Sequence, residues 1–108
     1  MLDDTPTGRK LLEALPCVSS ANIWGDEVYF NVPVKSALEL DACQLVAPGT
    51  VCFWVGGGSL AIPLGHTPPS FGERCHLVSK ANILGVLEDD PTSLRSVHDG
   101  DRITVQQA

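Results

Sequence analysis

The side chains best suited to chemistry gather in one segment, residues 20–30. The segment holds Asn22, Trp24, Glu27 and Tyr29 around a central Gly-Asp turn. Aromatic walls with a few well-placed polar groups are what a pocket for a small molecule or a peptide end requires. The plainer interpretation is that the indole caps the core and the carboxylates are only solvated, as most carboxylates in turns are.

Three further candidates lie in later segments of the chain. They are Trp54, which follows a run of β-forming residues, and the neighbours His66 and Thr67. We predict that Trp24, Glu27, Tyr29, Trp54 and His66 converge on one face of the fold. The complete predicted ligand-binding set is Asn22, Trp24, Glu27, Tyr29, Trp54, His66 and Thr67.

Other kinds of site find little support in the spacing of residues. The glycine run at residues 56–58 lacks the lysine and the following helix of a phosphate-binding loop, and is typical of a flexible hairpin tip. A metal site built from His66, His76 and an acid is conceivable but has no ligand spacing to support it. We predict no metal and no cofactor. No catalytic residue is identified, because a nucleophile and its base must meet in space.

Composition limits the class of protein. The chain has 108 residues, of which 44% are hydrophobic and 19% charged, which suits a single domain over residues 1–108 with one real core. That content is too apolar for a disordered chain. A net charge of −6 with scattered basic residues argues against nucleic-acid binding.

Several absences predict a cytoplasmic protein that does not enter membranes. No apolar run approaches the ~20 residues needed to cross a bilayer. No basic region precedes a greasy stretch near Met1, so a signal peptide is not expected. The cysteines form no Cys-x-x-Cys pair and are interpreted as reduced thiols. They are Cys17, Cys43, Cys52 and Cys75.

One helix is well marked near the N-terminus. Thr5 is the expected N-cap, and Pro6 occupies the first helical position, where its missing N–H costs nothing. The expected apolar face comprises Leu11, Leu12 and Leu15. The proline that follows this face should end the helix.

Beyond the helix, short alternating runs and frequent turns predict a mainly β fold. Strands are expected at residues 27–34, 51–55, 60–64, 82–87 and 102–106, with 51–64 forming a hairpin around the glycine loop. Residues 17–20 are the expected hairpin partner of 27–34, and residues 37–46 remain ambiguous. The predicted core is Val28, Phe30, Val32, Phe53, Leu60, Ile62, Ile83 and Val105.

The segment at residues 20–30 resembles the signature of the small prokaryotic cyclophilin-like family of unknown function. Members carry a close variant of Ser-Ala-Asn-x-Trp-Gly-Asp-Glu-x-Tyr-Phe. Other parts of the chain resemble further family elements, so the resemblance covers nearly the whole chain. These parts are the Thr-Pro-Thr helix start, the Phe-Trp and glycine elements, Gly-His-Thr-Pro and Asn-Ile-Leu-Gly. It implies a closed cyclophilin-like β-barrel with one short N-terminal helix.

Some features depart from the family pattern. Members usually have a β-hairpin before the Thr-Pro helix start, whereas this chain starts at Met1, four residues before Thr5. Loss of that hairpin would expose a sheet edge and apolar side chains. We therefore expect either residues upstream of Met1 or, preferably, a homodimer. His66 and Pro63 also stand where a proline and an aromatic residue are usual.

True cyclophilins are prolyl isomerases that share Phe-His-Arg, Gln-Gly-Gly and Gly-Thr-Gly-Gly-Glu motifs, which this sequence lacks. Arg9, Arg74, Arg95 and Arg102 fall in the helix, in a loop or near the C-terminus. We expect a domain that binds a small molecule or a peptide without standard prolyl isomerase activity, because fold alone does not carry activity. The alternatives are a divergent prolyl isomerase, an accessory part of an amidohydrolase or carboxyltransferase-type enzyme, or a non-catalytic subunit.

Overall fold

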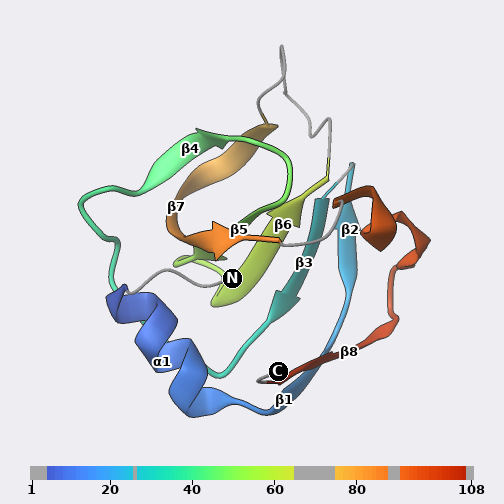
Figure 1. Ribbon diagram of the computed structural model, residues 1–108, viewed down its shortest axis with the longest axis horizontal. Helices are drawn as coiled ribbons and strands as arrows, with labels where there is room; N and C mark the ends of the chain where they lie inside the picture. Colours follow the sequence, from blue (N-terminus) through green and yellow to red (C-terminus); the bar gives the residue numbers. More distant parts are fainter. Residues whose placement is uncertain (1–4, 26, 65–74, 88–90, 107–108) are drawn as a thin grey trace.

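The computed structural model describes residues 5–25, 27–64, 75–87 and 91–106 (Figure 1). These residues form an α-helix, a short 3-10 helix and eight strands, so the mainly β prediction is confirmed. The elements are α1 (Pro6–Ala14), β1 (Cys17–Ser20), β2 (Asn22–Trp24), β3 (Glu27–Asn31), β4 (Cys43–Val46), β5 (Thr50–Trp54), β6 (Ser59–Pro63), β7 (Cys75–Val86), η1 (Pro91–Ser96) and β8 (Arg102–Val105).

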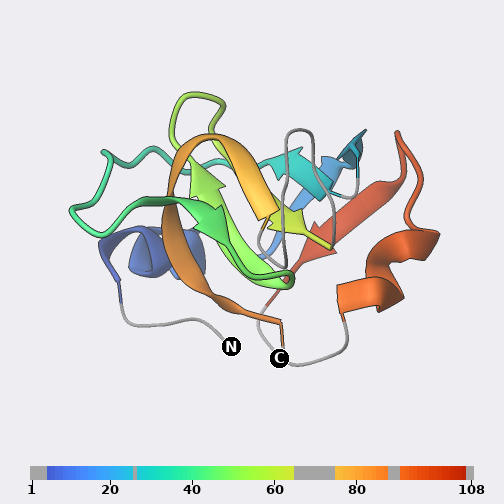
Figure 2. The same cartoon turned by 90° about the horizontal axis from the view of Figure 1, so that it is seen from above.

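The described strands form two antiparallel sheets. The larger sheet has the order β2-β3-β6-β5-β7-β4, and the smaller one consists of β1 and β8. The smaller sheet lies beside the β2–β3 side of the larger one in both views (Figures 1 and 2). The expected closed barrel is therefore wrong for the described residues, because no ladder joins the two end strands, β2 and β4.

A bend at Ala21 explains why the larger sheet does not close into a barrel on its β2 side. β1 pairs with β8, whereas β2, which starts one residue after Ala21, pairs with β3. At the bend, Ala21 donates its N–H to the Asp101 carbonyl at 2.7 Å, and its own carbonyl accepts from the Gly100 N–H at 2.8 Å. The Ile23 N–H then donates to the Asp99 carboxylate at 3.1 Å. The turn before β8 thus occupies the outer edge of β2, where a closing strand would have to pair.

β7 changes partners along its length in a similar way. Residues 82–86 pair with β5, while residues 75–81 pair with β4. This change brings β4 and the first half of β7 over one face of the larger sheet, where Val46 and Leu77 pack against Ala61 of β6. The sheet consequently has two covered faces and two hydrophobic clusters.

The main cluster lies on one face of the sheet and contains most of the predicted core. Val28, Phe30, Val32, Phe53, Leu60 and Ile62 are all buried there, and Val105 packs against it partly buried. Ile83 instead packs half-buried against the smaller cluster on the opposite face, which contains Val46, Cys52, Ala61, Leu77 and Ala81. The register argument from alternation is confirmed, since β3 turns Val28 and Phe30 to one side.

The helix is confirmed with one change to its buried face. The Thr5 hydroxyl accepts a hydrogen bond from the Gly8 N–H at 3.0 Å, as expected of an N-cap. Leu11 is buried and Leu15 packs partly against the core. The prediction for Leu12 is wrong, because its side chain is 41% exposed, and Thr7 takes the buried position instead.

The strand partner predicted for residues 27–34 is also wrong. A two-residue connection joins β2 to β3, so the residues just before the turn pair with β3 and β1 is left to pair with β8. The ambiguous segment, residues 37–46, is irregular except for β4. In the part of the chain that the structure describes, no helix is long and apolar enough to span a membrane.

Candidate ligand-binding site

The β2–β3 hairpin places four predicted site residues, Asn22, Trp24, Glu27 and Tyr29, on the sheet face opposite the main cluster. Gly25 in the turn has φ +60°, a conformation that favours glycine, and allows the chain to reverse immediately after Trp24. Trp24 pairs directly with Glu27, and Asn22 with Tyr29. Because directly paired residues point the same way, all four side chains share this face.

Strand β5 brings in the second tryptophan from a distant part of the sequence. Tyr29 pairs with Ala61, and Ala61 pairs with Cys52, so these residues form one row across three strands. Trp54 lies two positions beyond Cys52 and therefore points to the same face. The rings of Tyr29 and Trp54 meet edge to face, with centroids 6.3 Å apart and planes at 80°.

Among the described residues, four side chains line a depression of about 140 Å³, which we call the aromatic pocket: Trp24, Glu27, Tyr29 and Trp54. The predicted convergence is thus seen for these four residues. Asn22 shares their face, and its side-chain amide donates to the Tyr29 carbonyl at 3.4 Å. His66 and Thr67 lie outside the described residues, so their part in the site stays a prediction.

Glu27 is the chemically distinctive residue of the pocket. Its side chain is only 5% exposed at the start of β3, between Trp24 of β2 and Pro63 of β6. Burial disfavours the charged form and raises the pKa of Glu27 from its ordinary 4.5 to about 7. Near neutral pH the carboxyl group is therefore divided between its protonated and ionised forms, so it is able to donate or accept a proton or to meet a cation.

A smaller hollow of about 20 Å³ adjoins the aromatic pocket and has room for about one water molecule. It is lined by Glu27, Trp54, Ala61, Leu77, Ser79 and Ala81. Sequence reasoning missed the three positions on β7 because it began the strand at residue 82. No alternation marks this part of the strand, because Leu77 and Val78 are both apolar while Ser79 and Lys80 are both polar.

The glycine loop between β5 and β6 serves the pocket by holding Trp54. A Cβ atom added to Gly57 would lie 2.6 Å from Trp54 Cζ3 and 2.9 Å from Cδ2. One added to Gly56 would lie 3.3 Å from the indole Nε1. The Gly57 carbonyl lies 3.1 Å from the hydroxyl of buried Ser59, which fixes the loop against the strand. The backbone of this loop therefore packs on the indole, and the glycines are more than a flexible tip.

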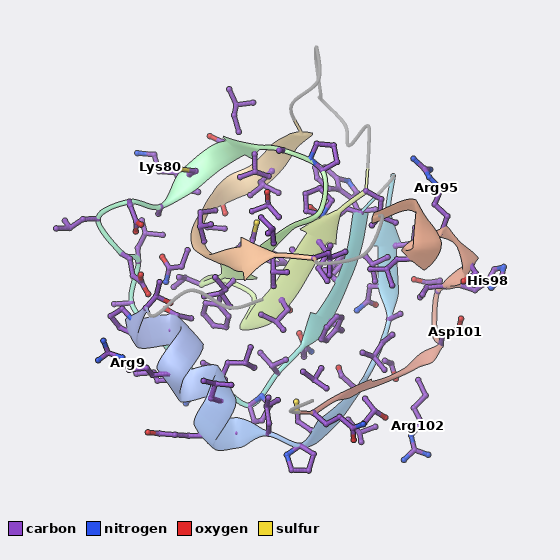
Figure 3. All side chains as sticks on the ribbon, in the orientation of Figure 1. Arg9, Lys80, Arg95, His98, Asp101 and Arg102 are labelled. Carbon is purple, nitrogen blue, oxygen red and sulfur yellow. The ribbon has the colours of Figure 1, made fainter. Side chains whose placement is uncertain are left out.

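Arg95 lines a different hollow, of about 100 Å³, that also reaches Glu27. Leu64, Leu94 and Val97 supply apolar walls there. Figure 3 shows the Arg95 side chain projecting from η1 at the periphery of the fold. Among the described arginines, the expectation that they fall away from the candidate site is correct for the aromatic pocket but not for this adjoining hollow, and Arg74 lies outside the described residues.

Metal binding has no support in the described part of the chain. No three His, Cys, Asp or Glu side chains there are grouped so that they could hold a metal ion.

The fold and the site together define a small two-sheet β domain with an N-terminal helix and an aromatic pocket on one sheet face. The family model described as Cyclophilin-like matches residues 1–106, and the chain belongs to this family. The family resemblance inferred from the sequence is therefore confirmed.

A solved structure supports the same assignment. The chain is similar to the hypothetical protein AF2241 from Archaeoglobus fulgidus, whose solution structure matches with a TM-score of 0.78 at 33% sequence identity. The match covers 94% of this chain and 77% of the archaeal one. No curated protein matches the sequence.

Proposed function

We propose that this cyclophilin-like domain is a binding module that holds a small molecule or the end of a peptide in the aromatic pocket. One observation carries the proposal: two tryptophans and a tyrosine from three strands surround a buried carboxyl group that titrates near neutral pH. Burying a carboxyl group opposes folding. A strongly perturbed acid in a concave aromatic site is a recognised mark of function.

The size of the pocket limits what it binds. Pockets for drug-sized ligands measure ~300–1,000 Å³. The aromatic pocket, at about 140 Å³, accommodates one compact group rather than a whole cofactor. The ligand is therefore a very small molecule, or a larger one that inserts only its terminal group.

The chain provides its own reporter for testing the proposal. It has two tryptophans, and both line the aromatic pocket. A library of small fragments added to ¹⁵N-labelled protein should shift the two indole N–H signals before it shifts backbone signals of β1 and β8. Trp54→Ala removes one indole signal and should abolish the shift of the other, which comes from Trp24. Val18→Ser, at an exposed position of β1 in the other sheet, should leave them unchanged.

Failure of the proposal would be clear in the same spectra. If no fragment moves either indole signal, or if the shifts persist in Trp54→Ala, the aromatic pocket is not a binding site.

We also propose that two copies of the chain pair through the edge of β4. This strand ends the sheet order among the described residues, and Leu45 on it is 38% exposed. An open strand edge with an apolar side chain favours pairing with another chain. Light scattering should report a dimer that Leu45→Lys converts to a monomer, and a monomer in the unaltered protein would refute the proposal.

A further inference from the structure

We propose that the group held in the aromatic pocket is a methylated ammonium cation, enclosed by the aromatic rings and facing the Glu27 carboxylate. The inference rests on the binding function proposed above and names the class of ligand. Two features of the pocket support it: the disposition of its rings, and the sign of its only charge-bearing group among the described lining residues.

The rings provide the walls that such a cation requires. Tyr29 and Trp54 stand at 80° to each other with centroids 6.3 Å apart, so they form two sides of a corner. Trp24, from the neighbouring strand β2, supplies a third aromatic side chain. The negative face of an aromatic ring attracts a cation within ~6 Å of its centroid, and tryptophan does so most strongly. Cages of this composition suit methylated ammonium groups, whose weakly hydrated methyls also gain from leaving water.

The charges around the pocket favour a cation over an anion. Glu27 is the acid in its wall, and none of the described lining residues is basic. Arg9, Lys80 and Arg102 lie at the periphery of the fold (Figure 3). The chain as a whole carries a net charge of −6, which attracts cations at long range. An anionic ligand would be repelled both by the Glu27 carboxylate and by the net negative charge of the chain.

The buried carboxyl group also discriminates between a cation and a neutral group of the same shape. An uncharged apolar group would fill the aromatic walls equally well. It would, however, leave an ionised Glu27 desolvated without a partner, which is strongly unfavourable. A cation supplies that partner, so binding and ionisation of Glu27 should reinforce each other.

This coupling predicts how affinity depends on pH. Among the described residues, the other titratable or charged groups near Glu27 are Tyr29 on the same strand, Cys52 on the same sheet face, and Arg95 in the adjoining hollow. The pKa of Glu27 is about 7, so only a few per cent of it is ionised at pH 5.5 and most of it at pH 8. If the ionised form alone binds, the apparent affinity rises roughly 30-fold between these two values.

A matched pair of probes tests the inference directly. Choline carries a trimethylammonium group, and 3,3-dimethylbutan-1-ol is its uncharged isostere with carbon in place of nitrogen. Both are titrated into the protein at pH 8, and tryptophan fluorescence is recorded, which reports on the pocket alone. We expect choline to bind at least tenfold more tightly than the neutral alcohol. Glu27→Gln should remove that preference and the pH dependence, and at pH 8 it should bind the neutral alcohol more tightly than the parent does, because no ionised carboxylate is then left without a partner.

The possible outcomes distinguish failure of the cation assignment from failure of the proposed binding function. Equal affinity for the two probes, or a choline preference that survives in Glu27→Gln, would overturn the cation assignment and leave a neutral-ligand pocket. Failure of choline to bind while other fragments shift the indole signals would overturn it too. A peptide carrying trimethyllysine forms a second arm. If it binds at least tenfold more tightly than choline, the cation comes from a modified protein, and comparable affinity identifies a free small molecule.

Discussion

Asn82 and Glu39 are joined by a hydrogen bond in which the side-chain oxygen of Asn82 accepts the backbone N–H of Glu39 at 2.7 Å. The amide nitrogen of Asn82 donates to the Thr7 hydroxyl at 3.0 Å and to the Ala37 carbonyl at 2.9 Å. Glu39 completes the link, because its carboxylate accepts from the Thr7 N–H at 3.1 Å and from the Thr7 hydroxyl. A fully buried side chain on β7 thus fastens both α1 and the irregular segment before β4.

We expect Asn82→Ala to lower the free energy of unfolding by about 3 kcal/mol, because one buried and two partly buried hydrogen bonds are lost and their partners remain unsatisfied. Urea denaturation followed by circular dichroism measures the change. Gln106→Ala, at an exposed position, serves as the control and should change stability by no more than about 0.5 kcal/mol. A loss below 1 kcal/mol for Asn82→Ala would show that the network contributes little.

Stability should fall as the pH rises through the range in which Glu27 ionises. The pKa of Glu27 is raised to about 7 in the folded protein, whereas its ordinary value is 4.5. The folded state therefore binds the proton more tightly than the unfolded state, and this contribution to stability is complete below pH 4.5 and lost by about pH 7. Glu27→Gln should remove it and make the variant more stable than the parent at pH 8, by on the order of 2 kcal/mol.

Chemical denaturation at pH 4.5, 6 and 8 tests this expectation. The stability difference between Glu27→Gln and the parent should grow steadily with pH. A difference that is constant across the three values would mean that the carboxyl group is as well solvated in the folded state as in the unfolded one.

Replacing Gly57 should disturb the aromatic pocket, whereas replacing the adjacent Gly58 should strain only the backbone of the loop. Gly57→Ala should displace Trp54, because the new methyl group would overlap the indole ring. Gly58→Ala should destabilise the loop by about 1 kcal/mol through its φ of +58°, but an added Cβ meets nothing within 4 Å. Tryptophan emission should therefore shift in Gly57→Ala and stay near that of the parent in Gly58→Ala, and equal spectra for the two variants would contradict the packing argument.

We expect no catalysis of prolyl isomerisation. That reaction needs a hydrogen-bond donor or cation fixed against the prolyl amide. Among the described residues the aromatic pocket offers aromatic rings and one acid, while Arg95 lines the adjoining hollow that also reaches Glu27. A standard Xaa-Pro peptide assay with catalytic amounts of protein should give the uncatalysed rate. Acceleration that is lost in Arg95→Lys would instead assign activity to that hollow.

The parts of the fold that depend on local signals were predictable from the sequence. Thr5 and Pro6 mark the start of α1 because capping and proline chemistry act over one turn. Alternation in β3 identified the inward positions Val28 and Phe30, and hence the opposite face that carries Glu27 and Tyr29. This alternation places Glu27 and Tyr29, and the β5–β6 hairpin places Trp54, whereas Trp24 lies on β2, a strand that the sequence pattern does not predict.

The remaining features depend on pairing between distant segments. The choice of β8 as the partner of β1 depends on hydrogen bonds at Ala21 that no local pattern indicates. Leu12 is exposed because the hydrogen bonds around Thr7 turn a different side of α1 toward the core. The role of Gly57 under the indole of Trp54 likewise emerges only when the loop is seen folded back on its own strand.

The β1–β8 ladder has a consequence for folding during synthesis. Ribosomes make the chain from its N-terminus, so β1 remains unpaired until β8 has left the exit tunnel. Closing a loop of this length is entropically costly and slow. Strands β2, β3, β5 and β6 precede β8 and pair mainly with near neighbours, so the walls of the aromatic pocket can assemble on the nascent chain. We expect docking of β8 to be the late event that locks a binding face already formed.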